Sequence, residues 1–360
     1  MKNAPYPTLL TPGPVPIPDF VQEALSLPTI HHRTPEFREL YGEVQQGLQY
    51  FFQTTGQTGV FFGSGSYGVE MSMQSLFHQG EKVMVLNFGK FSERWVQFGS
   101  HIGLEVIEVK AEWGKSPSVQ QVVEAATAHQ DLKGVIFTHS ETSTGALIDL
   151  EEMAFSLRRS HPDCLLVVDA ITSAGAMPYY HDAWDLDLSL GSSQKALMNP
   201  AGVVAFAISS RAMDRLSPTF SGDYANLYNY ADQAREQNFP FTAPTQLMYG
   251  LKAALLHIMA TGYPKIWNHT HQMATAFRSA LVERGAGIFP EVPSPTLTAF
   301  TVPGKETTDI QQQLVASMGI FLAGGQGHLK GKILRASHLA EGNQSAIDQL
   351  IHALNQGQIM

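Results

Sequence analysis

The chain has 360 residues, of which 44% are apolar and only 15% are charged. Its formal net charge of −9 at pH 7 argues against sequence-independent binding to nucleic acid or to an anionic membrane surface, because both need a basic protein surface. The low charged fraction indicates that part of the surface is buried against a partner subunit, so we expect a homo-oligomer. The single cysteine allows no internal disulfide and no signal segment or membrane-spanning stretch is evident, so we expect a cytoplasmic protein.

The first two thirds of the chain predict a large α/β domain. Residues 6–18 are rich in proline and are expected to form an extended arm, followed by a short amphipathic helix at 19–25. The expected strands are 59–62, 82–88, 104–109, 134–138, 164–168 and 186–190, and helical patterns such as 92–102 and 118–128 separate them. This alternation predicts a mostly parallel sheet covered by helices, with residues 202–208 as an antiparallel member.

The last third of the chain predicts a second, smaller domain of the α+β class. The expected elements are a helix over 244–259, a polar helix over 269–284, strands over 296–302 and 332–335, and a helix over 343–354. The domain limits that we predict are an N-terminal arm over 1–20, a large domain over 21–260 and a small C-terminal domain over 261–360.

Two isolated charges predict a cofactor site. Lys195 is the only charged residue between Leu188 and Ile208, and Asp169 ends a strand-like apolar run 26 positions earlier (195 − 169). Burying an ammonium group is costly unless it is paired or neutralised, and condensation with an aldehyde is one way to neutralise it. In pyridoxal 5′-phosphate (PLP) enzymes a lysine holds the cofactor aldehyde while an acid pairs with the ring nitrogen. The alternative is a buried structural ion pair between the two residues.

The segment FFGSGSYGVE, residues 61–70, predicts a phosphate site. It follows a strand and opens a helix, so backbone amides and the hydroxyls of Ser64 and Ser66 can hold a phosphate at the helix N-terminus. The same residues spell G-x-G-x-x-G, but the next strand ends in Asn87 and Phe88 and not in the acid that a dinucleotide site needs. A tight turn without a ligand is the third interpretation.

Other segments have weaker signals. THSETSTG, residues 138–145, follows a buried strand and suits either hydrogen bonds to a polar ligand or a helix cap, and Glu141 could serve both. Phe91 could stack on a flat ring, or belong to the core.

None of the 14 histidines forms HExxH or a Cys/His cluster, so no metal is expected. Cys164 lies in an apolar strand and is expected to be inert. The sequence HHR at 31–33 could line a pocket or be structural.

Taken together, these motifs resemble a class V aminotransferase of the fold-type I PLP family over nearly the whole chain. The motifs that carry the resemblance, in order, are LLTPGP, HHRTPEF, GSGSYGVE, NFGKFSER, HSETSTGAL, VVDAITSAG, GSSQKALMNPAG, FTAPT and AGGQGHLKGKILR. The resemblance is strongest to alanine or serine glyoxylate aminotransferases and to enzymes labelled as putative aspartate aminotransferases. It implies a large PLP-binding domain with a mostly parallel, seven-stranded type of sheet and a smaller C-terminal α+β domain.

Carried over position by position, the resemblance implies that Lys195 forms a Schiff base with the cofactor and that Asp169 pairs with the ring nitrogen. The other implied cofactor contacts are the phosphate ligands Ser64, Gly65, Ser66 and Gln194, Thr242 reaching the phosphate from the neighbouring subunit, Phe91 and Ile171 on the two faces of the ring, and Ser143 near the ring hydroxyl or substrate. The implied substrate contacts are Arg335, for the carboxylate, and Gly13. Some relatives have a phosphate-binding tyrosine where this chain has Phe239.

The activity that the resemblance implies is transamination by a homodimer between a small amino acid, such as alanine or serine, and a 2-oxo acid, such as glyoxylate or pyruvate. The alternatives are an aspartate, phosphoserine or aminophosphonate aminotransferase of the same fold, or a PLP lyase. A non-catalytic subunit that keeps the fold as a binding platform is the alternative from another class. The presence of both Lys195 and Asp169 argues against that alternative.

Overall fold

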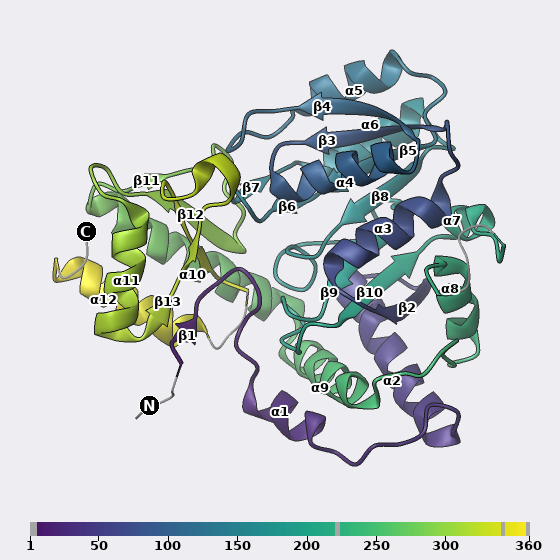
Figure 1. Ribbon diagram of the computed structural model, residues 1–360, viewed down its shortest axis with the longest axis horizontal. Coiled ribbons are helices and arrows are strands. Elements are labelled where there is room, and N and C mark those ends of the chain that lie inside the picture. Colours follow the sequence, from purple (N-terminus) through teal and green to yellow (C-terminus); the bar gives the residue numbers. More distant parts are fainter. Residues whose placement is uncertain (1–5, 220–223, 340–342, 358–360) are drawn as a thin grey trace.

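The computed structural model describes residues 6–219, 224–339 and 343–357, and a seven-stranded sheet forms the centre of its large domain (Figure 1). The strands of this sheet, in their spatial order, are β2 (Gln57–Phe62), β10 (Val203–Ile208), β9 (Leu188–Ser192), β8 (Leu165–Asp169), β5 (Gly134–Thr138), β3 (Lys82–Asn87) and β4 (Glu105–Lys110). Only β10 runs antiparallel to its neighbours, β2 and β9. The mostly parallel sheet with one antiparallel strand is therefore confirmed.

Helices cover this sheet and bury its central strands. Every residue of β5, β8, β9 and β10 is buried, as expected for strands that have a helix layer on each face. The helices of this part of the chain are α1 (Asp19–Leu25), α2 (Pro35–Phe52), α3 (Gly65–Leu76), α4 (Lys90–His101), α5 (Val119–Thr127), α6 (Leu150–Ser160), α7 (Ser210–Arg215), α8 (Leu227–Arg235) and α9 (Thr245–Thr261). A short hairpin of β6 (Ser140–Glu141) and β7 (Ala146–Leu147) follows β5.

The candidate functional residues meet at one edge of the sheet because parallel strands end there together. Strand β5 ends at Thr138 and its neighbour β8 ends at Asp169, and these two residues are paired in register. Strand β9 ends at Ser192, and the turn that follows it carries Gln194 and Lys195 before the chain returns as β10. Ligand sites of open α/β sheets lie at this carboxyl edge.

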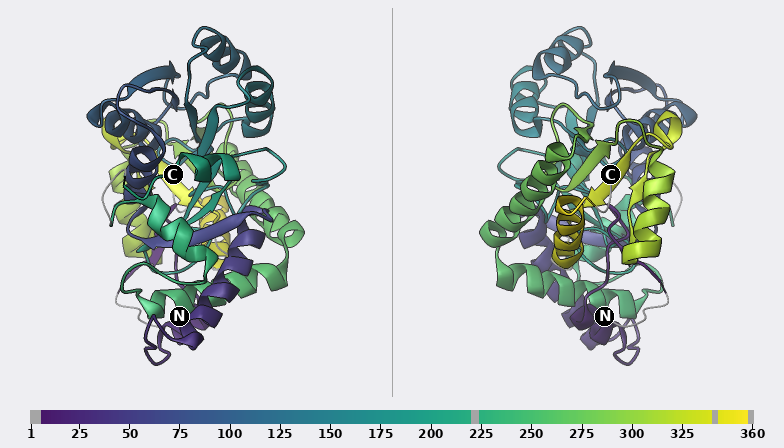
Figure 2. Two further views of the ribbon diagram at one scale, coloured as in Figure 1. Left: turned by 90° about the vertical axis from the view of Figure 1, so that its right-hand side faces the viewer. Right: turned by 90° about the vertical axis from the view of Figure 1, so that its left-hand side faces the viewer.

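A second sheet of four strands forms the small domain, and three helices pack around it (Figure 2). Its elements are α10 (Tyr263–Glu283), β11 (Gly287–Ile288), β12 (Leu297–Thr301), α11 (Thr307–Met318), β13 (Ile320–Phe321), β14 (Ala323–Gly324), the 3₁₀ turn η1 (Gly327–Leu329), β15 (Leu334–Ser337) and α12 (Gln344–Asn355). The arm contributes β1 (Thr8–Leu9), which pairs with β13 and not with the large sheet.

Helix α10 and the arm join the two parts of the molecule. The first turns of α10 pack Tyr263 and Trp267 against the core of the large domain, whereas Phe277 belongs to the core of the small one. The arm likewise places Leu10 in the small core and Val15 in the large core. The predicted polar helix over 269–284 is therefore the second half of a longer helix that begins directly after Gly262. The domain limits drawn from the sequence remain a prediction.

No helix in the described part of the chain combines the length and the apolar character that a membrane span needs.

Candidate active site

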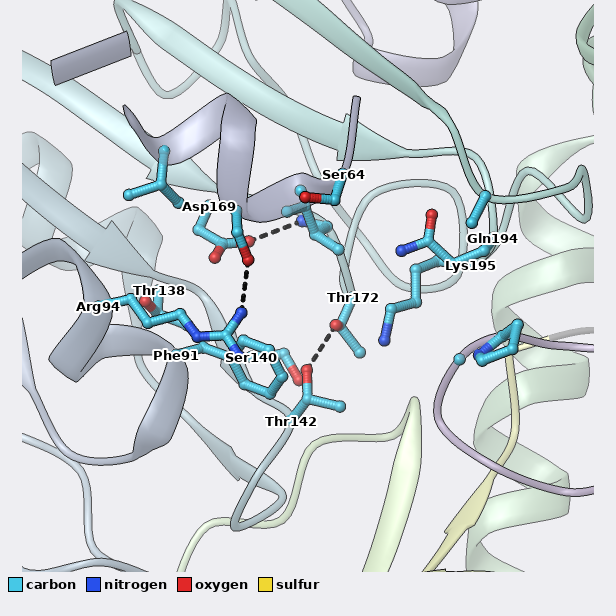
Figure 3. Close-up of a pocket in the computed structure, with 17 residues that line it drawn as sticks. Ser64, Phe91, Arg94, Thr138, Ser140, Thr142, Asp169, Thr172, Gln194 and Lys195 are labelled. Atoms are coloured by element: carbon cyan, nitrogen blue, oxygen red, sulfur yellow. Dashed lines mark hydrogen bonds between the residues drawn. The ribbon is translucent and has the colours of Figure 1, made fainter. Parts of the chain in front are cut away.

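A cleft of about 280 Å³ lies at the carboxyl edge of the large sheet and has walls from widely separated segments (Figure 3). The segments that line it are the arm (Gly13, Pro14), the turn into α3 (Ser64, Gly65, Ser66), helix α4 (Phe91, Arg94), the end of β5 and the β6 region (Thr138, Ser140, Thr142), the end of β8 (Asp169, Ile171, Thr172) and the turn after β9 (Gln194, Lys195). Most of the site residues implied by the resemblance thus lie around one space.

Lys195 is the buried amine of this cleft. Its side chain is 8% exposed, and Nζ donates a hydrogen bond to the backbone carbonyl of Pro12 in the arm. The pKa of Lys195 is lowered to about 8, chiefly by burial and also by the Arg335 charge, while the Asp169 charge acts in the opposite direction. None of the ion pairs among the described residues joins Lys195 to Asp169, so the structural ion-pair alternative is wrong. The amine lines the cleft, and it loses its proton at a lower pH than an ordinary lysine does.

Gly13 is the residue of the arm that leaves room for the Lys195 side chain. A Cβ atom added to Gly13 would lie 2.5 Å from Lys195 Nζ, and the backbone φ of Gly13 is +112°, which other residues rarely adopt. The glycine therefore lets the arm close over the lysine, and it lines the cleft as the resemblance led us to expect.

Asp169 ends the central strand β8 and is 7% exposed. Its Oδ1 accepts a hydrogen bond from the backbone N–H of Ile171 at 3.1 Å. The pKa of Asp169 is raised to about 6, chiefly by burial; the hydrogen bond from the Ile171 N–H lowers it and the Glu141 charge raises it. The carboxylate is ionised at neutral pH, but at a cost that a cationic ligand in the cleft would remove.

This cost predicts a pH-dependent gain in stability on replacing Asp169 by asparagine. A carboxyl whose pKa is raised on folding costs stability above pH 6 and ceases to do so as the pH falls through 6 towards 4. We expect cofactor-free Asp169→Asn protein to be more stable than the parent at pH 8, by about 1–3 kcal/mol, with the gain lost near pH 4. Denaturant unfolding at pH 8, 6 and 4 measures the difference. A gain that is constant over this range would contradict the assignment.

The turn into α3 forms the end of the cleft that was predicted to hold a phosphate. Ser64 is the N-cap of α3, with its Oγ accepting from the backbone N–H of Tyr67 at 3.4 Å. A Cβ on Gly65 would lie 2.7 Å from Ile171 Cδ1, so a larger residue here would require the Ile171 side chain to shift. Gln194 is held by Ser192, whose hydroxyl donates to its Oε1 at 2.6 Å. The predicted phosphate ligands are therefore together, at a helix N-terminus.

Ser143 is placed differently from what the resemblance implied. It does not line the cleft, because its hydroxyl donates to Glu141 Oε1 at 2.6 Å and accepts from the backbone N–H of Lys90 at 2.9 Å. The preceding residue, Thr142, lines the cleft instead, and its hydroxyl bonds to that of Thr172 at 2.7 Å. Of these two adjacent hydroxyl residues, Thr142 is the one that lines the cleft.

Glu141 caps helix α4, which settles the two interpretations of this residue. Its carboxylate is fully buried and accepts from the backbone N–H groups of Phe91, Ser92 and Ser143. A carboxylate at a helix N-terminus is favoured by the helix dipole. Glu141 thus fixes the turn of α4 that brings Phe91 to the cleft.

Arg335 lies in strand β15, behind the cleft wall. Its guanidinium donates to the backbone carbonyl of Thr142 at 2.8 Å and twice to that of Gly324. Burial lowers the pKa of Arg335 to about 10, and the Glu141 charge opposes this. No carboxylate among the described residues forms an ion pair with Arg335, so the group has no fixed counter-charge. It is not a lining residue, although its charge acts on Lys195.

Thr242 lies outside the cleft, exposed, in the segment before α9. Phe239, where some relatives have tyrosine, is buried against Phe62 and Tyr230. Arg33 of the HHR segment donates to the backbone carbonyls of Phe239 and Pro240, so it holds the chain that leads to Thr242.

The structure also describes the surroundings of Cys164 and of the side chains that could bind a metal. Cys164 is buried and its pKa is raised to about 12, chiefly by burial, so it does not supply a reactive thiolate. Among the residues that the structure describes, no group of three or more His, Cys, Asp or Glu side chains could hold a metal ion.

A buried lysine and a buried carboxylate on one cleft at the carboxyl edge of this sheet define a class, the fold-type I PLP enzymes. The chain belongs to the class-V aminotransferases, whose family model, "Aminotransferase class-V", matches residues 19–350. It is a PLP-dependent aminotransferase, as the sequence predicted.

Individual relatives cover nearly the whole chain. The "Soluble hydrogenase 42 kDa subunit" of Anabaena cylindrica is 35% identical over 92% of this chain and 88% of its own. The L-aspartate–glyoxylate aminotransferase of Paracoccus denitrificans is 29% identical over 92% of this chain and 86% of its own. The crystal structure of an alanine–glyoxylate aminotransferase from Nostoc sp. matches with a TM-score of 0.91 and 30% identity, over 98% of this chain and 96% of that one.

Proposed function

We propose that the cleft binds PLP and that the enzyme transfers an amino group from a small amino acid, alanine or serine, to glyoxylate or pyruvate. The observation that carries the proposal is that Lys195 and Asp169 face the same cleft without an ion pair between them. A buried hydroxyl of the cleft, Thr138 Oγ1, has no hydrogen-bond partner in the described structure, as expected of a group that serves a ligand. The residues present therefore fit the cofactor.

When bound, PLP supplies an aldehyde that condenses with amines and a ring that withdraws electrons from the substrate α-carbon. Residues of the cleft would bind the cofactor and move the proton. Lys195, with its pKa near 8, would provide the amine that holds the cofactor and would afterwards move the proton at the substrate α-carbon. Asp169 would pair with the ring nitrogen, and Ser64, Gly65 and Gln194 would hold the phosphate. Phe91 and Ile171 would pack on the ring.

The choice of substrates rests on Arg335 and on the relatives. Amino donors and 2-oxo acceptors both carry an α-carboxylate, which the planar guanidinium of Arg335 would bind through two parallel hydrogen bonds in exchange for its bonds to the backbone carbonyls of Thr142 and Gly324. Glyoxylate is named as substrate for both the Paracoccus and the Nostoc relative, with aspartate and alanine as donors. A screen of alanine, serine, glycine, aspartate and phosphoserine against glyoxylate and pyruvate tests the proposal. A tenfold or greater preference for aspartate or phosphoserine would overturn the small-donor assignment but not transamination.

A second candidate is a non-catalytic subunit that uses the fold as a binding platform. This candidate is raised by the Anabaena relative, which is named as a subunit of a hydrogenase. The buried, unpaired Lys195 and Asp169 support the enzyme instead, because a binding platform has no need for charged groups that cost stability inside a cleft. Turnover of any donor and acceptor pair in the screen would support the enzyme and exclude the non-catalytic subunit.

Replacing Arg335 by lysine is expected to raise the KM for donor and acceptor alike, by about tenfold, because an ammonium group cannot form the paired hydrogen bonds. Steady-state kinetics with each substrate varied in turn measure the change. Arg278→Lys is the matched control, since Arg278 is another arginine of the small domain that donates to backbone carbonyls, away from the cleft. An increase for one substrate only, or an equal increase in the control, would argue against a shared carboxylate site.

We further propose that the enzyme is a homodimer in which Thr242 completes the phosphate site of the neighbouring subunit. The exposed position of Thr242, away from its own cleft, supports this. Thr242→Ala should weaken PLP binding by about 1–3 kcal/mol, as for loss of a hydrogen bond to a charged group, without changing the subunit count. Equilibrium dialysis and light scattering measure the two quantities. A fully active monomer at assay concentration would exclude the shared site.

A further inference from the structure

Helix α4 brings a second cation, Arg94, to the cleft. Its guanidinium lines the cleft beside the turn that carries Ser66, and Nη1 donates to Ser66 Oγ at 2.6 Å (Figure 3). The Arg94 Cζ atom lies 4.9 Å from the centroid of the Phe91 ring. This cation–π contact and the hydrogen bond together hold the planar group at the phosphate end of the cleft.

Arg94 has no acidic partner among the residues that the structure describes. The ion pairs found there do not include it, and its one hydrogen bond is to the neutral hydroxyl of Ser66. Lys90, one turn earlier on the same helix, is different, because its ammonium group pairs with Glu93 at 3.2 Å. The positive charge of Arg94 is therefore free to act on a ligand.

The proposed phosphate site needs such a charge. A phosphate monoester carries about −1.5 to −2 charges at neutral pH, whereas Ser64, Gly65, Ser66 and Gln194 are neutral. The N-terminus of α3 adds only about half a positive charge. Lys195 is committed to the aldehyde, and the hydroxyl that some relatives supply at position 239 is absent because this chain has phenylalanine there, buried in the core. The cleft thus holds one unused cation, at the end where the anion would bind.

We propose that Arg94 is a cofactor-binding residue that pairs with the PLP phosphate, held in place by the Phe91 ring and by Ser66. The inference rests on the proposed function, since it requires PLP in this cleft. It also bears on specificity. A guanidinium engaged with the phosphate is not available for the second carboxylate of aspartate, which agrees with the small donors proposed above.

Titration of the cofactor-free protein with PLP and with pyridoxal, which lacks the phosphate, tests this role without an activity assay. The variants are Arg94→Gln, Arg94→Lys and, as the matched control, Lys90→Gln, which removes a positive charge from the same helix outside the cleft. We expect Arg94→Gln to raise the Kd for PLP by about tenfold or more, as for loss of a charge-assisted hydrogen bond, and the Kd for pyridoxal by less than about twofold. Arg94→Lys should fall between, because it keeps the charge but not the planar fork. Lys90→Gln should leave both constants unchanged.

Equal weakening of PLP and pyridoxal in Arg94→Gln would overturn the proposal, since Arg94 would then only support Phe91 or the fold. Unchanged PLP affinity would overturn it as well. If Arg94→Gln does not fold, Arg94→Lys is compared with Lys90→Gln instead. A loss of affinity for PLP but not for pyridoxal, in Arg94→Lys only, would then support the proposal. Failure of the parent protein to bind PLP covalently would instead refute the proposed function, so the two failures are distinguishable.

Discussion

Alanine in place of Lys195 is expected to lower the transamination rate by about a thousandfold or more, because the variant loses both the amine that holds the cofactor and the base that moves the α-proton. Single-turnover kinetics with the preferred donor measure the loss. Small amines added to the assay should restore part of the rate, since a free amine can take over the proton transfer in the space left by the side chain. A variant that turns over at more than a tenth of the parent rate would show that Lys195 is not the catalytic base.

We expect Lys195→Ala to stay folded, so its lower rate will reflect the lost amine and not unfolding. Lys195 is buried with its pKa lowered to about 8, so the folded state binds the proton less tightly than the unfolded chain does. The protonated lysine therefore costs stability at neutral pH, and that cost disappears as the pH rises from 8 towards 10.5. At pH 7 the cofactor-free Lys195→Ala protein should melt no lower than the parent. A clear drop in melting temperature would mean that the lysine supports the fold.

Asparagine in place of Asp169 is expected to slow transamination by about a hundredfold or more while leaving PLP covalently bound. A neutral amide no longer favours the protonated ring nitrogen, and the ring then withdraws electrons poorly from the α-carbon. The amide oxygen of the asparagine can still accept the hydrogen bond from the Ile171 N–H, so the local geometry should be retained. Stopped-flow spectroscopy of the half-reaction with the donor measures the rate.

Asp182→Asn is the matched control for this variant. Asp182 accepts hydrogen bonds from Thr54 and Thr55 and does not line the cleft, so its replacement should affect stability and not the half-reaction. Near-parent rates for Asp169→Asn, or equal rates for both variants, would refute the pairing of Asp169 with the ring.

The central features of the fold and site follow from local sequence signals. Apolar runs that are buried on both faces define the strands, and a charge at the end of such a run, as at Asp169, is placed at the ligand edge by topology alone. Lys195 is recognisable because its neighbours are apolar and its cost of burial needs a reason.

The features that sequence reasoning missed depend on which way single side chains point. Thr142 and Ser143 are adjacent hydroxyl residues in a turn, and only the bonds of Glu141 to Ser143 decide which of them faces the cleft. The contact between Lys195 and Pro12 joins residues 183 positions apart and has no local signal. Arg94 could have been found, because it lies three positions after Phe91 and such residues share a helix face.

Reductive trapping of the cofactor tests the central claim most directly. The purified protein is incubated with PLP, reduced with borohydride, digested and analysed by mass spectrometry, with Lys195→Ala treated in parallel. We expect the reduced cofactor on the peptide that contains Lys195 and on no other lysine in stoichiometric amount, and none on the variant. Stoichiometric labelling of another lysine, labelling of the variant, or transamination by a parent protein that cannot be labelled would contradict the account.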